Sequence, residues 1–192
     1  NQANIQHLLH NPQFKFIEKD CSLPIELDSS VDLIFHFASP ASPPKYQKYP
    51  IETLLVNSFG TFYLLELAKK HQARFIFAST SEIYGDPLEH PQKETYWGHV
   101  NPVGPRSCYD ESKRIGETFV TNFTRQFDLD CRIIRIFNTY GPRMDLEDGR
   151  VVTNFIRQIL KKQPLVIQGD GTQTRSFCFV SDLIEGISKI AF

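Results

Sequence analysis

Val31-Asp32-Leu33-Ile34-Phe35-His36-Phe37-Ala38 is a mostly apolar run, and the fold can be inferred outward from it. Such a run is typical of a strand buried on both faces of a parallel sheet. Further strands are predicted at 74–79 and 131–137, with helices before each of them, at 50–71 and 107–127. Strands that alternate with helices predict a doubly wound α/β fold, in which helices cover both faces of a parallel sheet.

The flanking segments give weaker patterns. Residues 2–10 look like the tail of a helix, and residues 14–18 alternate as a strand does. Loops are predicted at 39–49 and 84–106, where proline and glycine gather. Beyond Asn138 the rhythm changes, and we predict a helix at 151–162, a strand at 165–168, a turn at 169–171, a strand at 176–180 and a helix at 182–192. Because the sequence begins and ends within helical patterns, we expect it to be a piece of a longer protein.

Composition narrows the function classes. The chain has 192 residues, 41% of them apolar, which allows one sizeable core or one domain with part of a second. Its net charge of -1 gives no electrostatic reason to bind nucleic acid or an anionic membrane. The 4 cysteines are widely spaced, which predicts neither a zinc site nor a disulfide framework and fits a reducing, cytoplasmic compartment. No apolar run approaches the ~18 residues of a membrane span.

Tyr109 and Lys113 are the candidate acid–base pair. They lie four positions apart at the start of a predicted helix, so both side chains point from one face. A phenol titrates near ~10, and a neighbouring ammonium favours the phenolate, which would bring Tyr109 into the range of a general base. The same spacing is also common among surface residues, and the pair therefore needs support from the rest of the chain.

That support comes from the predicted strand ends, because ligands of open parallel sheets lie beyond the carboxyl ends of the strands. One strand ends in Phe37 followed by the small residues Ala38 and Ser39. The next runs into Ser79-Thr80-Ser81-Glu82, and the third into Phe137-Asn138-Thr139. Hydroxyls at such positions are often only helix caps or turn residues. Their presence at several neighbouring strand ends, beside a Tyr/Lys helix, favours an active site.

Several stretches resemble the extended short-chain dehydrogenase/reductase family, whose members act on nucleotide sugars with NAD. Within it, the sequence is most similar to the UDP-glucuronate decarboxylases (UDP-xylose synthases). The matching stretches lie in the same order along nearly the whole chain: residues 36–44, 79–87, 96–102, 108–111, 138–144, 148–152 and 172–177.

The resemblance implies a role for each candidate residue. Tyr109 would take the proton from the sugar C4 hydroxyl, Thr80 would hydrogen-bond that hydroxyl, and Lys113 would bind the nicotinamide ribose and lower the Tyr109 pKa. Ser81 and Glu82 would complete the catalytic set. The residues implied for NAD are Phe37, Ala38, Ser39, Asn57, Ala78, Tyr109, Lys113 and Thr139, and those implied for the UDP-sugar are Asn138, Arg150, Val152 and Arg175.

The reaction implied is decarboxylation of UDP-glucuronate to UDP-xylose through a 4-keto intermediate, with the NAD regenerated in each cycle. A 4,6-dehydratase, a 4-epimerase and a catalytically silent NAD-binding protein remain as alternatives. Dehydratases carry Asp-Glu where this chain has Ser81-Glu82, and an added Asp would repel a substrate carboxylate. A silent relative would be expected to have lost Tyr109 or Lys113.

The resemblance also predicts the domain organisation. Residues 1–140 would form an NAD-binding Rossmann-type domain that lacks its first strand and Gly-rich turn, and 141–192 part of a substrate-binding lobe. The resemblance to this family also implies a homodimer. Leu55 stands where these decarboxylases usually have a substrate-binding Lys. His36 is expected to be a core histidine, and His90 and His99 lack the spacing of metal ligands.

Overall fold

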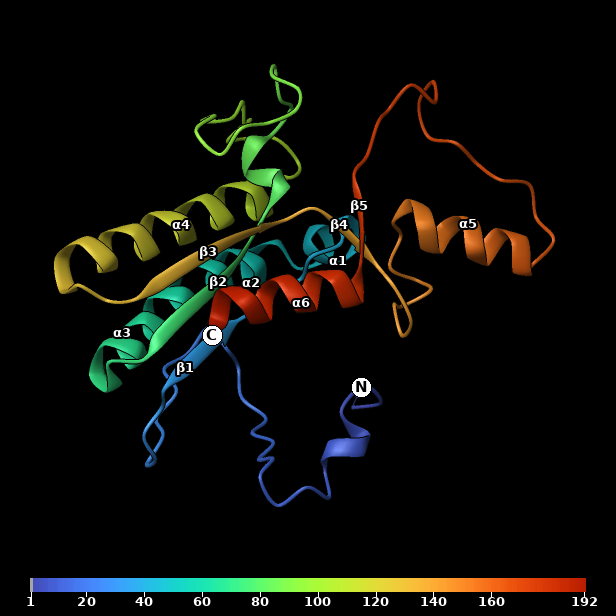
Figure 1. The fold of residues 1–192 in the computed structure, drawn as a ribbon. Coiled ribbons are helices and arrows are strands. Elements are labelled where there is room, and N and C mark those ends of the chain that lie inside the picture. Colours follow the sequence, from blue (N-terminus) through green and yellow to red (C-terminus); the bar gives the residue numbers. More distant parts are fainter. Residues whose placement is uncertain (1) are drawn as a thin grey trace.

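A three-stranded parallel sheet forms the centre of the computed structural model, which describes residues 2–192 (Figure 1). Its order is β1 (Leu33–His36), β2 (Arg74–Thr80) and β3 (Cys131–Ile136). The predicted strands and their parallel pairing are confirmed. Asn1, where the predicted first domain begins, lies outside the described residues.

One continuous helical path leads from β1 to β2. It consists of α2 (Pro50–Leu55), a π-helical turn (Val56–Gly60) and α3 (Thr61–His71). Pro50 occupies the first turn of α2, where its missing N–H costs no hydrogen bond. The path confirms the predicted helix at 50–71, and the π-helical turn within it was not predicted.

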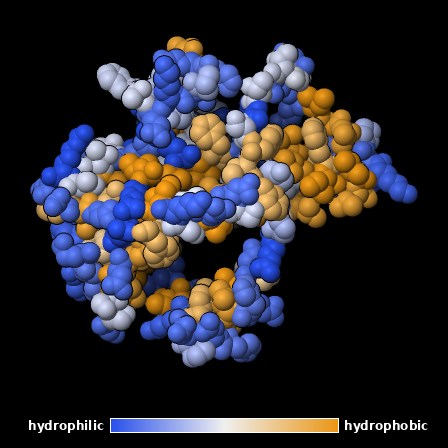
Figure 2. All heavy atoms as spheres, in the orientation of Figure 1, coloured by the Kyte–Doolittle hydropathy of each residue, from blue (hydrophilic) through white to orange (hydrophobic). Residues whose placement is uncertain are grey.

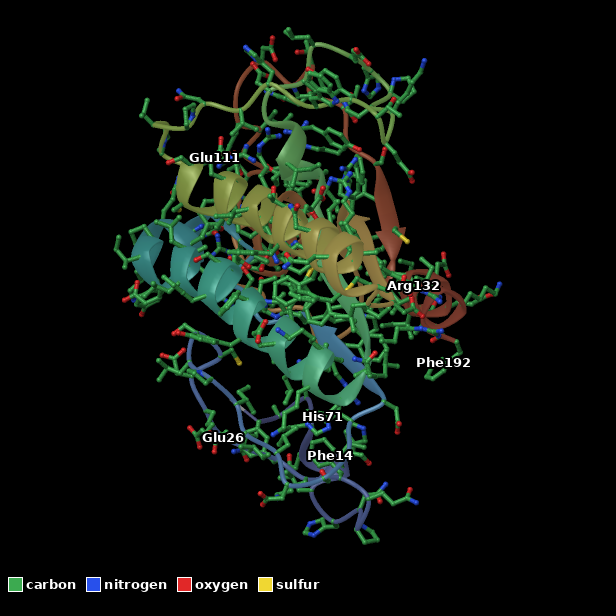
Figure 3. All side chains as sticks on the ribbon, turned by 90° about the vertical axis from the view of Figure 1, so that its left-hand side faces the viewer. Phe14, Glu26, His71, Glu111, Arg132 and Phe192 are labelled. Atoms are coloured by element: carbon green, nitrogen blue, oxygen red, sulfur yellow. The ribbon has the colours of Figure 1, made fainter. Side chains whose placement is uncertain are left out.

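Helices α3 and α4 (Ser107–Phe127) pack side by side on one face of the sheet (Figures 1 and 3). The core between them and the strands holds Leu65, Ala68, Phe75, Phe77, Val120 and Phe123. Gly116 of α4 lies against the Phe77 ring so closely that an added Cβ would come 2.3 Å from Cζ. The missing side chain thus lets α4 approach β2.

The last helix, α6 (Val180–Ala191), lies on the other side of the sheet, as Figures 1 and 3 show. Its carboxyl end is tied to the starts of the strands, because Arg74 donates to the carbonyl of Ala191 and Arg132 to that of Ile190. Helices therefore cover both faces, as predicted for a doubly wound fold.

A second, two-stranded parallel sheet follows the first. It pairs β4 (Asn138–Tyr140) with β5 (Phe177–Phe179), and α5 (Val151–Leu160) lies between them in sequence. Apolar side chains gather on the surface around α5 (Figure 2), with Ile159 61% and Leu160 70% exposed.

Three predicted elements are wrong. Residues 14–18 and 165–168 form no strand, and residues 2–10 contain only a short 3₁₀ turn, Gln6–Leu8. An alternating pattern makes a strand only where a neighbouring backbone completes the ladder, and neither segment pairs with a described strand. The predicted loop at 39–49 contains α1 (Pro43–Lys48), since prolines at the first helical positions are compatible with a helix.

Strand β1 is also not buried on both faces. Ile34 and His36 are buried, whereas Phe35 is 43% and Phe37 42% exposed, their rings in edge contact. The reason is that α3 packs on the face that holds Ile34 and His36, whereas Phe35 and Phe37 point to the other face. The apolar composition therefore predicted the strand correctly but predicted more burial than the strand has.

Candidate active site

A cavity of about 450 Å³ lies at the carboxyl ends of the central strands. This is the place where open parallel sheets bind their ligands. The predicted site residues that line it are Phe37, Ser39, Ala78, Thr80, Ser81, Glu82, Tyr109, Lys113, Asn138, Thr139, Arg150, Val152 and Arg175. Residues from both sheets and from α4 thus converge on one space. Ala38 and Asn57 do not line it.

Tyr109 and Lys113 project from the first turns of α4 into this cavity, and both side chains are buried. Lys113 Nζ donates to the carbonyl oxygen of Ala78 over 2.8 Å and lies 5.9 Å from the centre of the Tyr109 ring. The hydrogen bond depends on the close approach of α4 to β2. Tyr109 is also within hydrogen-bonding contact of the Thr80 side chain.

The electrostatics of the pair differ from the sequence-based expectation. Burial raises the pKa of Tyr109, although the Thr80 hydrogen bond and the charges of Arg150 and Arg106 act in the opposite direction. Burial also lowers the pKa of Lys113 to about 7, so this amine is only partly charged at neutral pH. The expected lowering of the Tyr109 pKa by Lys113 is therefore not found. Desolvation outweighs the attraction because both groups are buried.

Asn57 does not line the cavity but hydrogen-bonds to Ser39, which does. It lies in the π-helical turn, is fully buried, and donates to the hydroxyls of Ser39 (3.0 Å) and Ser112 (3.1 Å). Its Oδ1 has no hydrogen-bond partner among the described residues. The Asn57 amide thus connects α4 to the loop that follows β1.

Ser81 and Glu82 begin a short 3₁₀ turn, Ser81–Tyr84, directly after β2. The Thr80 hydroxyl caps this turn by accepting a hydrogen bond from the Glu82 N–H over 3.2 Å. Thr80 therefore has both a local capping function and a contact with Tyr109.

Two residues at the site were missed by sequence reasoning. Arg106, just before α4, forms ion pairs with Glu82 and, over 3.7 Å, with Asp110. Tyr46 of α1 stacks on Tyr109 with ring centroids 5.0 Å apart. Tyr46 lies 63 residues before Tyr109, so no sequence spacing pointed to this contact. Arg106 could have been recognised as a partner of Asp110, because the two are four residues apart.

The predicted UDP-sugar residues line the cavity as well. Arg150 precedes α5 and forms an ion pair with the buried carboxylate of Asp148. Asn138 donates to the Ser176 carbonyl, and Arg175 is exposed, with a hydrogen bond to the Thr174 carbonyl. Two arginines, Arg150 and Arg175, thus line the cavity, which suits an anionic ligand.

Leu55 and His36 can also be placed. Leu55, at the end of α2, is 37% exposed and does not line the cavity. His36 is a buried core histidine, as predicted, with Nε2 3.0 Å from the Thr61 hydroxyl. Among residues 2–192 no cluster of three or more His, Cys, Asp or Glu side chains could hold a metal ion. None of the helices described combines the length and apolarity needed to cross a membrane.

The parallel sheet and the Tyr109–Lys113 pair at its carboxyl edge define an α/β protein with a candidate acid–base site. Residues 2–191 match the model of the NAD dependent epimerase/dehydratase family, and the chain belongs to this family.

Comparison with curated proteins gives nearer relatives. The chain is 56% identical over 186 residues to UDP-glucuronic acid decarboxylase 1 of Arabidopsis thaliana. The aligned residues make up 97% of this chain and 42% of the relative. It is 52% identical to UDP-glucuronic acid decarboxylase 1 of Xenopus tropicalis, with 97% and 44% covered. The chain thus spans about half the length of the curated relatives it matches.

Solved structures show the same fold. Pal from Bacillus thuringiensis superposes with a TM-score of 0.84 at 29% identity, over 100% of this chain and 62% of that one. UDP-glucuronic acid 4-epimerase from Bacillus cereus, in complex with UDP-glucuronic acid and NAD, superposes with a TM-score of 0.78 at 30% identity, over 97% and 58%.

Proposed function

We propose that this chain belongs to a longer NAD-dependent enzyme that decarboxylates UDP-glucuronate to UDP-xylose. The observation that carries the proposal is the convergence of Tyr109, Lys113, Thr80 and the Ser81-Glu82 pair on one cavity. The identity to UDP-glucuronic acid decarboxylases from plants and a frog supports the choice of reaction.

The residues around the reacting carbon have distinct roles in this proposal. Tyr109 removes the proton of the C4 hydroxyl, and Thr80, in contact with Tyr109, holds that hydroxyl in place. Bound NAD would supply a reversible hydride acceptor for C4 and would not be consumed. The resulting C4 ketone lies beta to the C5 carboxylate, and carbon dioxide leaves because the electrons of the broken bond flow into an enolate. Glu82 positions the ring or handles the C5 proton.

Part of an NAD site fits the residues present. Lys113 and Tyr109 would hold the nicotinamide ribose, and Phe37, Ser39, Ala78 and Thr139 line the space beside them. Ala38 and Asn57 would act from the adjoining wall, where the unpartnered Asn57 Oδ1 leaves an acceptor free. The 192 residues contain no Gly-x-x-Gly-x-x-Gly turn for the pyrophosphate.

Asn138, Arg150, Val152 and Arg175 would bind the UDP-sugar, with the arginines near the diphosphate or base oxygens. Residues 1–140 would belong to the Rossmann-type domain and 141–192 to the substrate lobe. We also propose a homodimer in the reducing environment of the cytoplasm. Ile51 and Phe59, 61% and 53% exposed on the α2–α3 path, and Ile115 on α4 provide an apolar face for it.

A 4-epimerase is the second candidate, since the Bacillus cereus UDP-glucuronic acid 4-epimerase has the same fold. Ser81-Glu82 argues against a 4,6-dehydratase, because an acid at position 81 is missing. The full-length protein, incubated with NAD and UDP-glucuronate, should release carbon dioxide and yield UDP-xylose by mass spectrometry, without net NADH. An isomer of unchanged mass, separated from the substrate by chromatography, would indicate the epimerase. In a parallel incubation with UDP-glucose, a dehydrated sugar would indicate the dehydratase.

A further inference from the structure

Arg106 lies where two cavities meet. Besides the cavity of about 450 Å³, a larger one of about 980 Å³ lies under the 84–106 loop, and both are lined by Ser81, Glu82 and Arg106. The guanidinium of Arg106 pairs with the Glu82 carboxylate and lies 3.7 Å from Asp110 Oδ1. Arg106 is therefore the cation paired with the carboxylate that follows the carboxyl end of β2.

The local charge is negative without this arginine. Glu82 and Asp110 contribute two carboxylates, and Asp110 is buried. Burial, together with the charge of Glu111, raises the pKa of Asp110 to about 6, while Arg106 acts in the opposite direction. A substrate carboxylate that entered beside Ser81 would be a third negative group, and like charges this close oppose one another.

The other cations of the cavity are engaged elsewhere. Lys113 donates to the Ala78 carbonyl, and Arg150 pairs with Asp148. Arg175 lines both cavities, but its hydrogen bond goes to the carbonyl of the preceding residue, Thr174. Of the cationic side chains that line the cavity, Arg106 is the one paired with Glu82.

We propose that Arg106 determines specificity for a carboxylate-bearing sugar. It offsets the charge of Glu82 and Asp110, so that the site accepts an anionic sugar that these two carboxylates alone would repel. A neutral sugar on the same nucleotide does not need this compensation. The inference rests on the proposed function and names a residue for its substrate class.

The test compares the affinities of the NAD-loaded full-length protein for UDP-glucuronate and for UDP-glucose, by isothermal titration. Arg106→Gln should weaken UDP-glucuronate binding about tenfold and change UDP-glucose binding by less than about threefold. Arg106→Lys, which keeps the charge, should restore most of the preference. The matched control is Arg175→Gln, which should weaken both ligands alike because both carry the diphosphate.

A second variant covers the case in which Arg106→Gln does not fold. Glu82→Gln removes the charge that Arg106 offsets, so the preference for UDP-glucuronate over UDP-glucose should rise. Equal losses for both ligands in Arg106→Gln, or an unchanged preference in Glu82→Gln, would overturn the inference.

Product analysis distinguishes a failure of this inference from a failure of the proposed function. If the enzyme makes UDP-xylose and keeps its preference for UDP-glucuronate without Arg106, the inference alone is refuted. If the enzyme makes no UDP-xylose and the preference still depends on Arg106, the reaction is wrong and the inference stands.

Discussion

Tyr109 and Lys113 illustrate how burial changes residues that the sequence places correctly. The four-residue spacing brings both to one face of α4, but burial raises the pKa of Tyr109 and lowers that of Lys113. Thr80 of β2, Arg150 before α5 and Arg106 before α4 act to lower the Tyr109 pKa, and Lys113 is not among the groups that shift it. The pKa of Tyr109 is thus set by residues from several segments together.

Tyr109→Phe removes the hydroxyl and keeps the ring that stacks on Tyr46. In the full-length enzyme, turnover should fall by about 10²–10⁴, the scale of general acid–base catalysis, while the affinity for the UDP-sugar stays close to wild type. Steady-state kinetics and titration calorimetry measure the two effects. Turnover within about threefold of wild type would show that Tyr109 is not the base.

His36 should make the fold sensitive to acid. Burial first, and the charge of Lys113 second, lower its pKa from 6.5 to about 4. Between these values the unfolded chain binds a proton that the folded protein does not, so stability falls as the pH falls through this window. At pH 5 the expected loss, relative to pH 7.5, is about 2 kcal/mol.

Urea unfolding of the full-length protein at several pH values measures this loss. In His36→Gln the stability should decline less between pH 6.5 and 4.5 than in wild type, and comparing slopes cancels other groups such as Asp110. His90→Gln, in an exposed loop, should keep the wild-type slope. Parallel slopes for wild type and His36→Gln would contradict the prediction.

At the scale of elements, the contact of α4 with β2 positions the site. Gly116 lets the helix approach the sheet, and Lys113, less than one turn earlier, then reaches the Ala78 carbonyl. The Phe77 ring is fully buried and has little room to move. A methyl group at position 116 would therefore push α4 outward.

Gly116→Ala should lower the free energy of unfolding by about 1–2 kcal/mol, because overpacking outweighs the gain in helix propensity. Gly186→Ala in α6 is the matched control, since an added Cβ there meets nothing within 4 Å. The control should gain up to about 1 kcal/mol. Denaturant unfolding measures the free energy of unfolding of the two variants. A Gly116→Ala protein as stable as the control would contradict the prediction.

At the scale of the whole molecule, the described chain has much uncovered apolar surface. Phe35 and Phe37 are exposed on the edge strand β1, and the surface around α5 is apolar in Figure 2. An exposed apolar edge invites association with other chains. The chain also spans only about half the length of its curated relatives.

The 192-residue chain by itself should therefore be marginally stable, prone to aggregate and unable to bind NAD measurably. The physical reasons are the exposed edge of β1 and the absence from these residues of a Gly-rich turn for the pyrophosphate. Isothermal titration of the purified chain with NAD measures the affinity, with the full-length protein as the positive control. Saturable micromolar binding to a monomer of the chain would refute the prediction.

The sequence alone determined the alternation of strands and helices, the parallel sheet and the shared face of Tyr109 and Lys113. These features follow from local periodicity and backbone preferences, which neighbouring residues set. Only the tertiary structure decided that residues 14–18 form no strand and that Phe35 is exposed. It also decided that Arg106 pairs with Glu82 and that the Tyr109 pKa is raised. These features depend on which distant segments pair with, cover or desolvate a residue. Spacing along the chain does not specify these long-range contacts.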